Sequence, residues 1–407
     1  MEPQEATEED ILLAQRIISA ASRHDLAALQ ILLKDGSANV QDPTTGTTPL
    51  HAAIAACTPN DAAETNVDEG KGKAKGSART EEGAVKIVEE LLQNGAIWND
   101  LNKDNETPGC VAHRLGLMKL YQIMVEAGVR AELLFSKMDE LDLDETDNEP
   151  AIIPKKNPPI QGLQESEQIM RDGEDDDVSL DNHAYLKSKL RFQPGILLDE
   201  SHNAVMMDWE TAIMTRHAET LLPSPGLRAM NVGHGMGIVD RAIQERKPKE
   251  HHIVEAHPQV LEKMRKEGWM DKPGVRVWEG RWQDVLPRMV EQGVLLDGIY
   301  YDTFAEDYKA LREFFSEWVV QLLDPSGGVD EEGGLFGWYN GLGADRQICY
   351  DVYTKVAEMD LYEAGFDTKW EDIAVPESLH GSEAWKGTRR PYWALDVYRL
   401  PVNTFIK

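Results

Sequence analysis

The stretch of sequence that decides the fold is Met230-Asn231-Val232-Gly233-His234-Gly235-Met236-Gly237-Ile238. A short apolar run ends at three glycines, each separated by one residue, and an apolar helical pattern follows. This order predicts a strand, a tight turn and the N-terminus of a helix. Because glycine has no Cβ, backbone N–H groups at such a turn can approach a bound ligand closely. The loop by itself is compatible with a dinucleotide or with S-adenosylmethionine.

Strand and helix patterns alternate around this loop. The predicted strands before the last two are Leu227–Val232, His252–Ala256, Val275–Trp278, Gly298–Tyr301 and Leu335–Asn340. The predicted helices are Gln259–Lys266, Trp282–Val290 and Tyr308–Leu322. A late hairpin follows, with strands near Trp370–Val375 and Trp393–Leu400. We therefore expect an α/β domain with a doubly wound, Rossmann-like sheet of seven strands and a ligand at the carboxyl ends of the strands.

The N-terminal region contains an internal repeat. Thr47-Thr48-Pro49-Leu50-His51-Ala52-Ala53 matches the start of an ankyrin repeat, and Asn105–Ala112 is a degenerate copy. Two apolar helix patterns end at Gly95 and Gly128, which are 33 residues apart, the ankyrin period. An all-α stack of such repeats either binds protein or braces the neighbouring domain.

These patterns predict three regions. Residues 1–135 are expected to form the ankyrin-repeat domain, with an inserted flexible loop near 58–82 that has few large apolar residues. Residues 136–182 form an acidic, partly mobile linker interrupted by prolines, which is a solvated tether or an electrostatic guide for a basic substrate. Residues 183–407 form the α/β domain.

The composition limits the partners and the compartment. The 407 residues carry a formal net charge of −30, which repels nucleic acid and anionic membranes and attracts basic partners, unless the charge serves solubility alone. No apolar run is long enough to span a membrane. The widely spaced Cys57, Cys110 and Cys349 predict neither a metal site nor a disulfide framework. A reducing compartment, cytoplasm or nucleus, is expected.

Features beyond the glycine loop favour S-adenosylmethionine over a dinucleotide. Glu255 lies 22 residues after Gly233, at the end of the second strand, where a carboxylate can accept hydrogen bonds from ribose hydroxyls. The G-x-G-x-G spacing lacks the third glycine position of the dinucleotide fingerprint. Carboxylates and aromatic rings also suit a sulfonium cation. Candidate aromatic walls are Tyr185, Phe192 and Trp282, although ordinary core packing is an alternative for Tyr185 and Phe192.

Five motifs in order carry a family resemblance. They are Val205-Met206-Met207-Asp208-Trp209-Glu210-Thr211-Ala212-Ile213-Met214, Asn231–Val239, Ile253–His257, Gly280–Asp284 and Asp297–Thr303. From about Asp181 to its C-terminus the chain resembles guanidinoacetate methyltransferase. With ankyrin repeats in front, the whole chain resembles the fungal type IV protein arginine methyltransferases, which methylate the internal (δ, or N5) guanidino nitrogen of arginine.

The resemblance implies a class I methyltransferase fold, S-adenosylmethionine as methyl donor and S-adenosylhomocysteine as product. The cofactor contacts that it implies are Met214, Gly233, His234, Gly235, Met236, Gly237, Ile238, Glu255, Ala256, His257, Arg281, Trp282 and Asp302. His257 and Arg281 depart from the residues of the small-molecule enzyme, so the polar contacts around the adenosine are expected to differ there.

Glu210 and Asp302 resemble the two carboxylates with which the family holds its substrate. A guanidinium presents a planar fork of N–H donors, which carboxylates match bidentately. The two residues are therefore the predicted catalytic and substrate-binding groups, with the backbone of Thr303 as a further acceptor. A carboxylate facing the attacking nitrogen stabilises the developing charge and takes its proton.

The resulting hypothesis is S-adenosylmethionine-dependent methyl transfer to the internal nitrogen of an arginine in a basic protein, with a ribosomal protein as one candidate. One alternative is methylation of a small guanidino compound, as in guanidinoacetate methyltransferase. The other is a non-catalytic ankyrin adaptor, which the presence of Glu210, Asp302 and the glycine loop disfavours.

Overall fold

The computed structural model describes residues 7–57, 81–144, 182–328 and 333–407. By its internal contacts the chain divides into two units, Met1–Asp177 and Val178–Lys407, and each is described by itself. None of the described helices is both long and apolar enough to cross a membrane.

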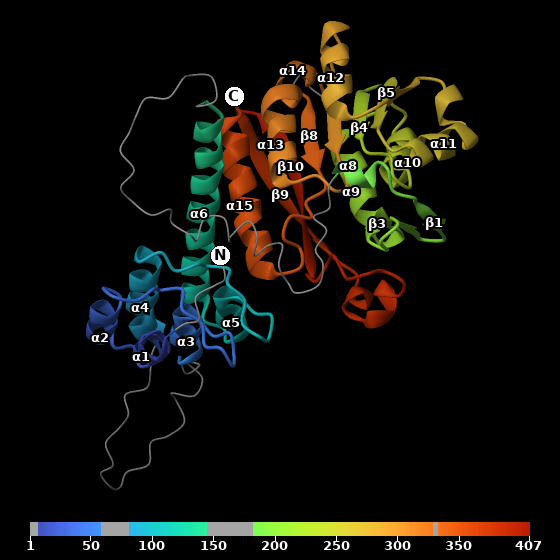
Figure 1. Ribbon diagram of the computed structural model, residues 1–407. Helices are drawn as coiled ribbons and strands as arrows, with labels where there is room; N and C mark the ends of the chain where they lie inside the picture. The colour runs from blue at the N-terminus through green and yellow to red at the C-terminus, as the bar shows by residue number, and fades with distance from the viewer. Residues whose placement is uncertain (1–6, 58–80, 145–181, 329–332) are drawn as a thin grey trace, which may run out of the picture. The chain divides into compact units, whose positions relative to one another are not determined.

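In the described part of the first unit, all the regular secondary structure is helical (Figure 1). Its helices are α1 (Glu8–Ser22), α2 (Leu26–Leu32), α3 (Pro49–Ala55), α4 (Glu81–Gln93), α5 (Pro108–Arg114) and α6 (Met118–Asp144). Helices α3 and α5 start at the two Thr-Pro pairs, as predicted. The hydroxyls of Thr48 and Thr107 accept backbone N–H groups of the first turn, and each proline occupies a position whose N–H needs no partner.

Helix α6 corrects the predicted end of this region. It runs without interruption through Gly128, which was expected to end a helix, and continues to Asp144, inside the predicted linker. From Met118 to Asp144 the sequence holds good helix formers and no proline, so nothing stops the helix at residue 135. The rest of the predicted linker, 145–181, and most of the predicted loop, 58–80, lie outside the described residues.

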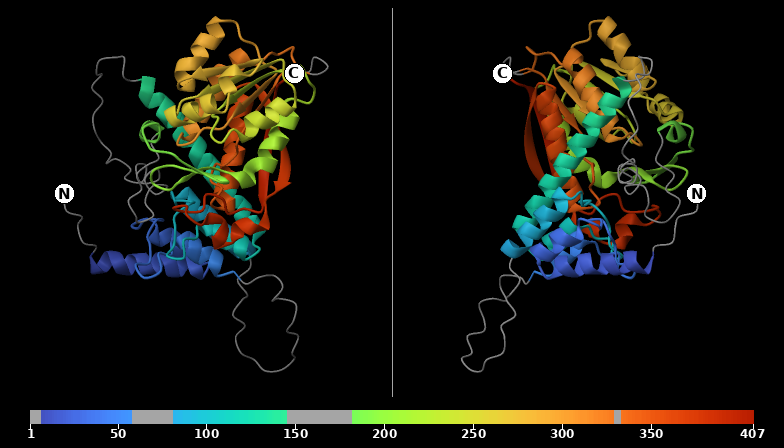
Figure 2. Two further views of the ribbon diagram at one scale, coloured as in Figure 1. Left: turned by 90° about the vertical axis from the view of Figure 1, so that its right-hand side faces the viewer. Right: turned by 60° about the vertical axis from the view of Figure 1, so that its left-hand side comes forward.

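The second unit contains the predicted seven-stranded sheet, in the order β6-β5-β4-β7-β8-β10-β9. Its strands are β4 (Arg228–Val232), β5 (Glu250–Glu255), β6 (Val275–Glu279), β7 (Gly298–Tyr301), β8 (Leu335–Trp338), β9 (Phe366–Ala374) and β10 (Val397–Phe405). The first five are parallel, and β10 is antiparallel to both β8 and β9. The late hairpin, orange-red and red in Figure 2, thus forms one edge of the sheet.

Helices cover both faces of this sheet. One core joins it to α12 (Trp282–Glu291), α13 (Tyr308–Glu313), the π-helical segment η5 (Phe314–Val319) with α14 (Val320–Leu322), and α15 (Gln347–Glu363). The other joins it to α9 (Thr211–Leu221), α10 (Ile238–Glu245), α11 (Pro258–Lys266) and the 3₁₀ turn η4 (Trp269–Asp271). The doubly wound arrangement is therefore confirmed, although α15 was not predicted from its sequence.

A small antiparallel sheet precedes the large one and was also not predicted. After α8 (Asn182–Tyr185) it consists of β1 (Arg191–Gln193), β2 (Ile196–Leu198) and β3 (Ala204–Met207). Strand β3 leads directly into the 3₁₀ turn η3 (Asp208–Glu210), which delivers Glu210 to the start of α9. Two further turns, η6 (Glu377–His380) and η7 (Ser382–Trp385), separate β9 from β10.

Candidate active site

A cavity lies at the carboxyl ends of the parallel strands, where the fold predicts a ligand. Ten of the predicted site residues line it: Tyr185, Glu210, Gly233, Gly235, Glu255, Ala256, Arg281, Trp282, Asp302 and Thr303. These residues come from the ends of four different strands and from the segment before the large sheet. The tertiary structure therefore brings both predicted carboxylates to the same cavity as the glycine loop.

The glycine loop requires glycine at its first position. Gly233 has φ +94°, and a Cβ there would lie 1.9 Å from the carbonyl oxygen of Asp302. The same peptide segment is tied back to β4, because the Asp302 N–H donates to Val232 O at 2.9 Å. The close approach of these two backbones places Asp302 directly beside the loop.

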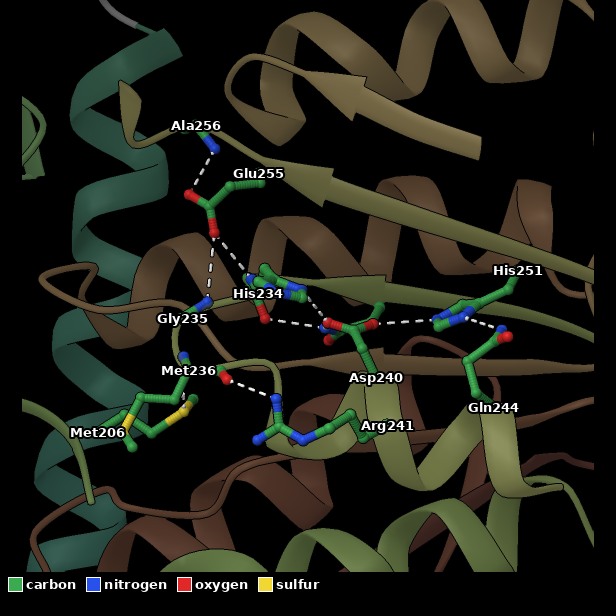
Figure 3. A network of polar contacts seen from close by, with 12 residues as sticks. Met206, His234, Gly235, Met236, Asp240, Arg241, Gln244, His251, Glu255 and Ala256 are labelled. Carbon is green, nitrogen blue, oxygen red and sulfur yellow. Dashed lines mark hydrogen bonds and ion pairs between the residues drawn. The ribbon is translucent and has the colours of Figure 1, made fainter. Parts of the chain in front are cut away.

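Glu255 joins the loops that follow β4 and β5. One carboxylate oxygen accepts the N–H groups of Ala256 at 2.8 Å and His257 at 2.6 Å. The other accepts the N–H of His234 at 2.8 Å and, at a long 3.4 Å, that of Gly235 (Figure 3). Because the last contact is long, this second oxygen retains capacity for a donor on a ligand in the cavity.

His234 corrects a predicted cofactor contact. Its side chain is fully buried and does not line the cavity; its Nδ1 instead lies 2.6 Å from Asp240 Oδ2, which also accepts from Asn231 Nδ2 at 2.9 Å. The other oxygen of Asp240 lies 3.0 Å from Nε2 of the buried His251 (Figure 3). Burial alone would raise the pKa of Asp240, but the two imidazoles hold it well below its usual range. The backbone N–H of His234 thus binds Glu255 within the loop, while its ring is buried in the core against Asp240.

Five other residues that were predicted to contact the cofactor are also absent from the lining of the cavity. Met214 is fully buried in α9, and the backbone N–H of Met236 points to Met206 Sδ at 3.3 Å. Gly237 and Ile238 lie at the start of α10. The His257 ring caps α11 by accepting the Gln259 N–H at 3.2 Å.

Phe192 is not a wall of the cavity. It lies on β1, the edge strand of the small sheet, where all three residues are exposed. The ammonium of Lys263 lies 5.7 Å from the centroid of its ring. Tyr185 does line the cavity, with its ring against Phe304 and His257 at centroid distances of 4.9 and 5.0 Å.

The third-strand motif forms one side wall. Trp282 donates its indole N–H to both carboxylate oxygens of Glu306, at 3.1 and 2.9 Å, and the hydroxyl of Tyr301 donates to Glu306 at 2.6 Å. Arg281 lines the cavity with its buried Nε lacking a hydrogen-bond partner among the described residues. Glu306 follows Asp302 in a loop without a motif, so sequence reasoning missed it.

Glu210 also lines the cavity and is 4 % exposed. The hydroxyl of Tyr392 donates a hydrogen bond to Glu210 Oε1, and Trp209 Nε1 donates to the Tyr392 oxygen at 2.9 Å. This order of donors commits the phenol proton of Tyr392 to the carboxylate. Tyr392 belongs to an irregular segment before β10 and was missed, because nothing in its sequence context marks it as part of a site.

Both carboxyl groups have raised pKa values. Burial, followed by the charge of Asp302, raises the pKa of Glu210 well above its usual range. Burial, followed by the charge of Asp240, raises the pKa of Asp302 to about 7. In the part of the chain that the structure describes, neither group has an ion-pair partner. Glu210 is buried and Asp302 is partly buried, and the two carboxyl groups line one cavity without a cation among the described residues. Such a site favours a cationic ligand, since the ligand would lower both pKa values.

The chain is similar to several known proteins. The family model described as guanidinoacetate N-methyltransferase matches residues 191–380. The chain is 51% identical to protein arginine N-methyltransferase 2 of Aspergillus fumigatus, over 97% of each chain, and 49% identical to the protein of that name from Aspergillus oryzae, over 98% of each. Among solved structures, the O-methyltransferase TomG from Streptomyces achromogenes in complex with SAM matches 48% of this chain and 80% of its own, with 11% identity and a TM-score of 0.34.

Proposed function

Because this chain belongs to the family of fungal proteins named protein arginine N-methyltransferase 2, we propose that it transfers a methyl group from S-adenosylmethionine to the internal guanidino nitrogen of an arginine in a protein. The observation that carries this proposal is the pair of carboxyl groups, the buried Glu210 and the partly buried Asp302, which line the same cavity as the glycine loop and have no ion-pair partner among the described residues. A guanidinium is the cation that two carboxylates match best.

The residues of the cavity fit the methyl donor. Glu255 has an oxygen with spare acceptor capacity for a ribose hydroxyl, and Arg281 has a buried donor without a partner. The backbone at Gly233 and Gly235 borders the cavity without side chains. When bound, S-adenosylmethionine supplies a methyl group activated by its positively charged sulfur. Tyr185 and Trp282 are the aromatic walls that we propose for this charge.

The two carboxylates have different tasks in this proposal. Glu210, oriented by Tyr392, holds the terminal nitrogens of the guanidinium and balances its charge. Asp302 faces the internal nitrogen, stabilises the positive charge that develops there and accepts its proton. A group with a pKa of about 7 is suited to this exchange near neutral pH, and Thr303 adds a backbone acceptor beside it.

We also propose that the helices before residue 135 are ankyrin-type repeats that bind the protein substrate. The capped Thr-Pro starts of α3 and α5 support this assignment. The net charge of −30 favours a basic partner, such as a ribosomal protein. Three widely spaced cysteines suit a reducing compartment, so cytoplasm and nucleus are the proposed locations.

A small guanidino acceptor is the second candidate, favoured by the family model that matches residues 191–380. The deciding experiment incubates the protein with labelled S-adenosylmethionine and either an extract from methylation-deficient cells or guanidinoacetate. We expect labelled protein whose fragmentation mass spectrum gives arginine methylated on the internal nitrogen. Labelling of terminal nitrogens alone, or of guanidinoacetate alone, would contradict the proposal.

A further inference from the structure

One polar group in the cavity has no task in the function proposed above. Tyr339 follows β8 directly and lines the cavity together with Glu210, Asp302 and Tyr392. Its hydroxyl oxygen is shielded from solvent and has no hydrogen-bond partner among the described residues. A buried hydroxyl without a partner costs free energy, so its presence beside a ligand cavity suggests that the ligand supplies the partner.

The fold places Tyr339 next to Asp302. Strands β7 and β8 are parallel neighbours in which Tyr301 pairs with Trp338, and the next residue of each strand is Asp302 and Tyr339 respectively. The Tyr339 N–H still donates to Tyr301 O at 2.9 Å, so the two strands remain side by side at this point. Paired residues in a parallel ladder project toward the same face of the sheet. The side chains of Asp302 and Tyr339 therefore leave their strands on the same side, and both residues line the cavity.

The ring of Tyr339 is held by its neighbours, while its hydroxyl is left free. Tyr398 and Trp393 pack against the ring at centroid distances of 5.6 and 6.5 Å. Burial first, and then neighbouring acidic groups led by Glu210, raise the pKa of Tyr339 well above its usual range, so the phenol stays neutral. A neutral phenol offers both a proton and an acceptor oxygen.

Two carboxylates that each bind bidentately match four N–H donors, so a guanidinium has a further N–H for another acceptor. It carries five N–H donors, four of them on the terminal nitrogens. One oxygen of Glu210 already accepts the hydroxyl of Tyr392, and Asp302 is engaged with the internal nitrogen in the function proposed above. Besides the second Glu210 oxygen and the Thr303 backbone, a further acceptor would satisfy an N–H of a terminal nitrogen that is removed from water.

We propose that Tyr339 is a substrate-binding residue whose hydroxyl oxygen accepts an N–H from a terminal nitrogen of the acceptor guanidinium. The inference rests on the proposed function and names a third side chain of the same site. Together with Glu210 it holds the terminal nitrogens, so that the internal nitrogen is the one left facing Asp302.

The chain offers a matched control in Tyr300. Its hydroxyl is also buried and without a partner among the described residues, but Tyr300 lies on β7 against His217, at a ring distance of 4.8 Å, and does not line the cavity. Tyr300→Phe and Tyr339→Phe each remove one buried, unpartnered oxygen. Only the second variant removes an oxygen from a residue that lines the cavity.

The experiment titrates an arginine-rich peptide, and separately guanidinoacetate, into the full chain saturated with S-adenosylhomocysteine. For Tyr339→Phe we expect the acceptor Kd to rise roughly 10- to 100-fold, the range for a lost hydrogen bond to a charged donor. The Kd for S-adenosylhomocysteine should stay unchanged, and Tyr300→Phe should leave both constants unchanged.

Three results would overturn the inference: an unchanged acceptor Kd for Tyr339→Phe, an equal rise for both variants, or a parallel loss of S-adenosylhomocysteine affinity. Because binding is measured without turnover, this experiment tests the role of Tyr339 separately from the proposed methyl transfer. A wild-type chain that binds the peptide without methylating it would contradict the function alone, whereas one that binds neither acceptor would contradict both.

Discussion

The hydroxyl of Tyr392 donates a hydrogen bond to Glu210 Oε1 across 182 residues of sequence. Trp209, the neighbour of Glu210, in turn donates to the Tyr392 oxygen at 2.9 Å. These contacts orient a buried carboxylate that the segment between β3 and α9 could not orient alone. They also distinguish Glu210 from Asp302, whose pKa burial raises to about 7 and to which no side chain in the described part of the chain is seen to donate in this way.

Loss of either carboxylate should abolish methyl transfer. For Glu210→Gln and Asp302→Asn we expect kcat/KM to fall at least roughly 100-fold, because each change removes a charge that faces the reacting cation. The measurement is transfer of label from S-adenosylmethionine to protein, with the Kd for S-adenosylhomocysteine as a check of folding. Glu200→Gln, at an exposed position of the same unit, should be fully active. Activity in both carboxylate variants would refute the assigned roles.

Tyr392→Phe should act through Glu210. A hydrogen bond to a charged acceptor contributes about 1.5–3 kcal/mol, so kcat/KM should fall by roughly one to two orders of magnitude. If Tyr392 only orients Glu210, the double variant Glu210→Gln, Tyr392→Phe should be no worse than Glu210→Gln alone. Additive losses in this cycle would show that Tyr392 has an independent role.

The activity should depend on the ionisation of Asp302, whose pKa is about 7 in the free protein. We expect kcat/KM to rise at least tenfold per pH unit below this value and to level off above it, since the base must be ionised. The raised pKa of Glu210 steepens this rise. A rate profile that is flat between pH 5.5 and 8 would argue against Asp302 as the base.

The raised pKa of Asp302 also predicts that the stability of the fold falls as pH rises, in contrast to the activity. Since the folded state holds the Asp302 proton more tightly than the unfolded state, the stability from this group is largest at acidic pH and is lost as pH rises to about 7. The ceiling for a shift from 3.8 to about 7 is about 4 kcal/mol. Asp302→Asn should therefore melt at a higher temperature than the wild type at pH 8, with a smaller difference at pH 5. A lower melting temperature at pH 8 would contradict this.

Asp240 should influence both the glycine loop and the base. Asp240→Asn leaves His234 and His251 without their shared anion, for which we expect a loss of roughly 3–5 kcal/mol in the free energy of unfolding and weaker S-adenosylhomocysteine binding. Removing this charge should also move the midpoint of the rate profile to lower pH, because Asp240 contributes to the raised pKa of Asp302. The exposed Asp271→Asn serves as the control, and an unmoved midpoint would rule out the electrostatic link.

The net charge of −30 should matter for a protein substrate. We expect the KM for a basic protein to rise with ionic strength, because added salt screens the attraction between the partners. Guanidinoacetate, which carries no net basic charge, provides the control and should show little change. A KM for protein that is independent of salt would exclude recruitment by the acidic surface.

Much of the catalytic unit could be predicted from local patterns. The strand that ends at Val232, the helix that starts at Ile238 and the doubly wound character of the sheet follow from apolar periodicity and glycine placement. The motifs around Glu210 and Asp302 carried enough information to assign two carboxylates to one ligand. Helix α6 was cut short because an acidic segment was interpreted as a linker, although its residues are good helix formers.

Local sequence could not assign the direction in which individual side chains point. His234 lies between two loop glycines, yet its ring points into the core because it contacts Asp240 and Trp269 there. Phe192 was predicted as a wall and instead lies on an exposed edge strand. These directions depend on residues from other elements, which no window around the position contains.

The sequence by itself determined the α/β fold of the second unit and the ligand end of its sheet, because apolar periodicity and glycine placement are properties of the chain. The two carboxylates were predicted from the resemblance to guanidinoacetate methyltransferase, which the motifs carry. Only the tertiary structure showed that Tyr392 donates to Glu210, that Trp282 donates to Glu306 and that the Tyr339 hydroxyl has no partner among the described residues. The physical reason is that a site's burial and hydrogen bonds arise from segments far apart in sequence, and these groups acquire their pKa values and partners only when the strands align.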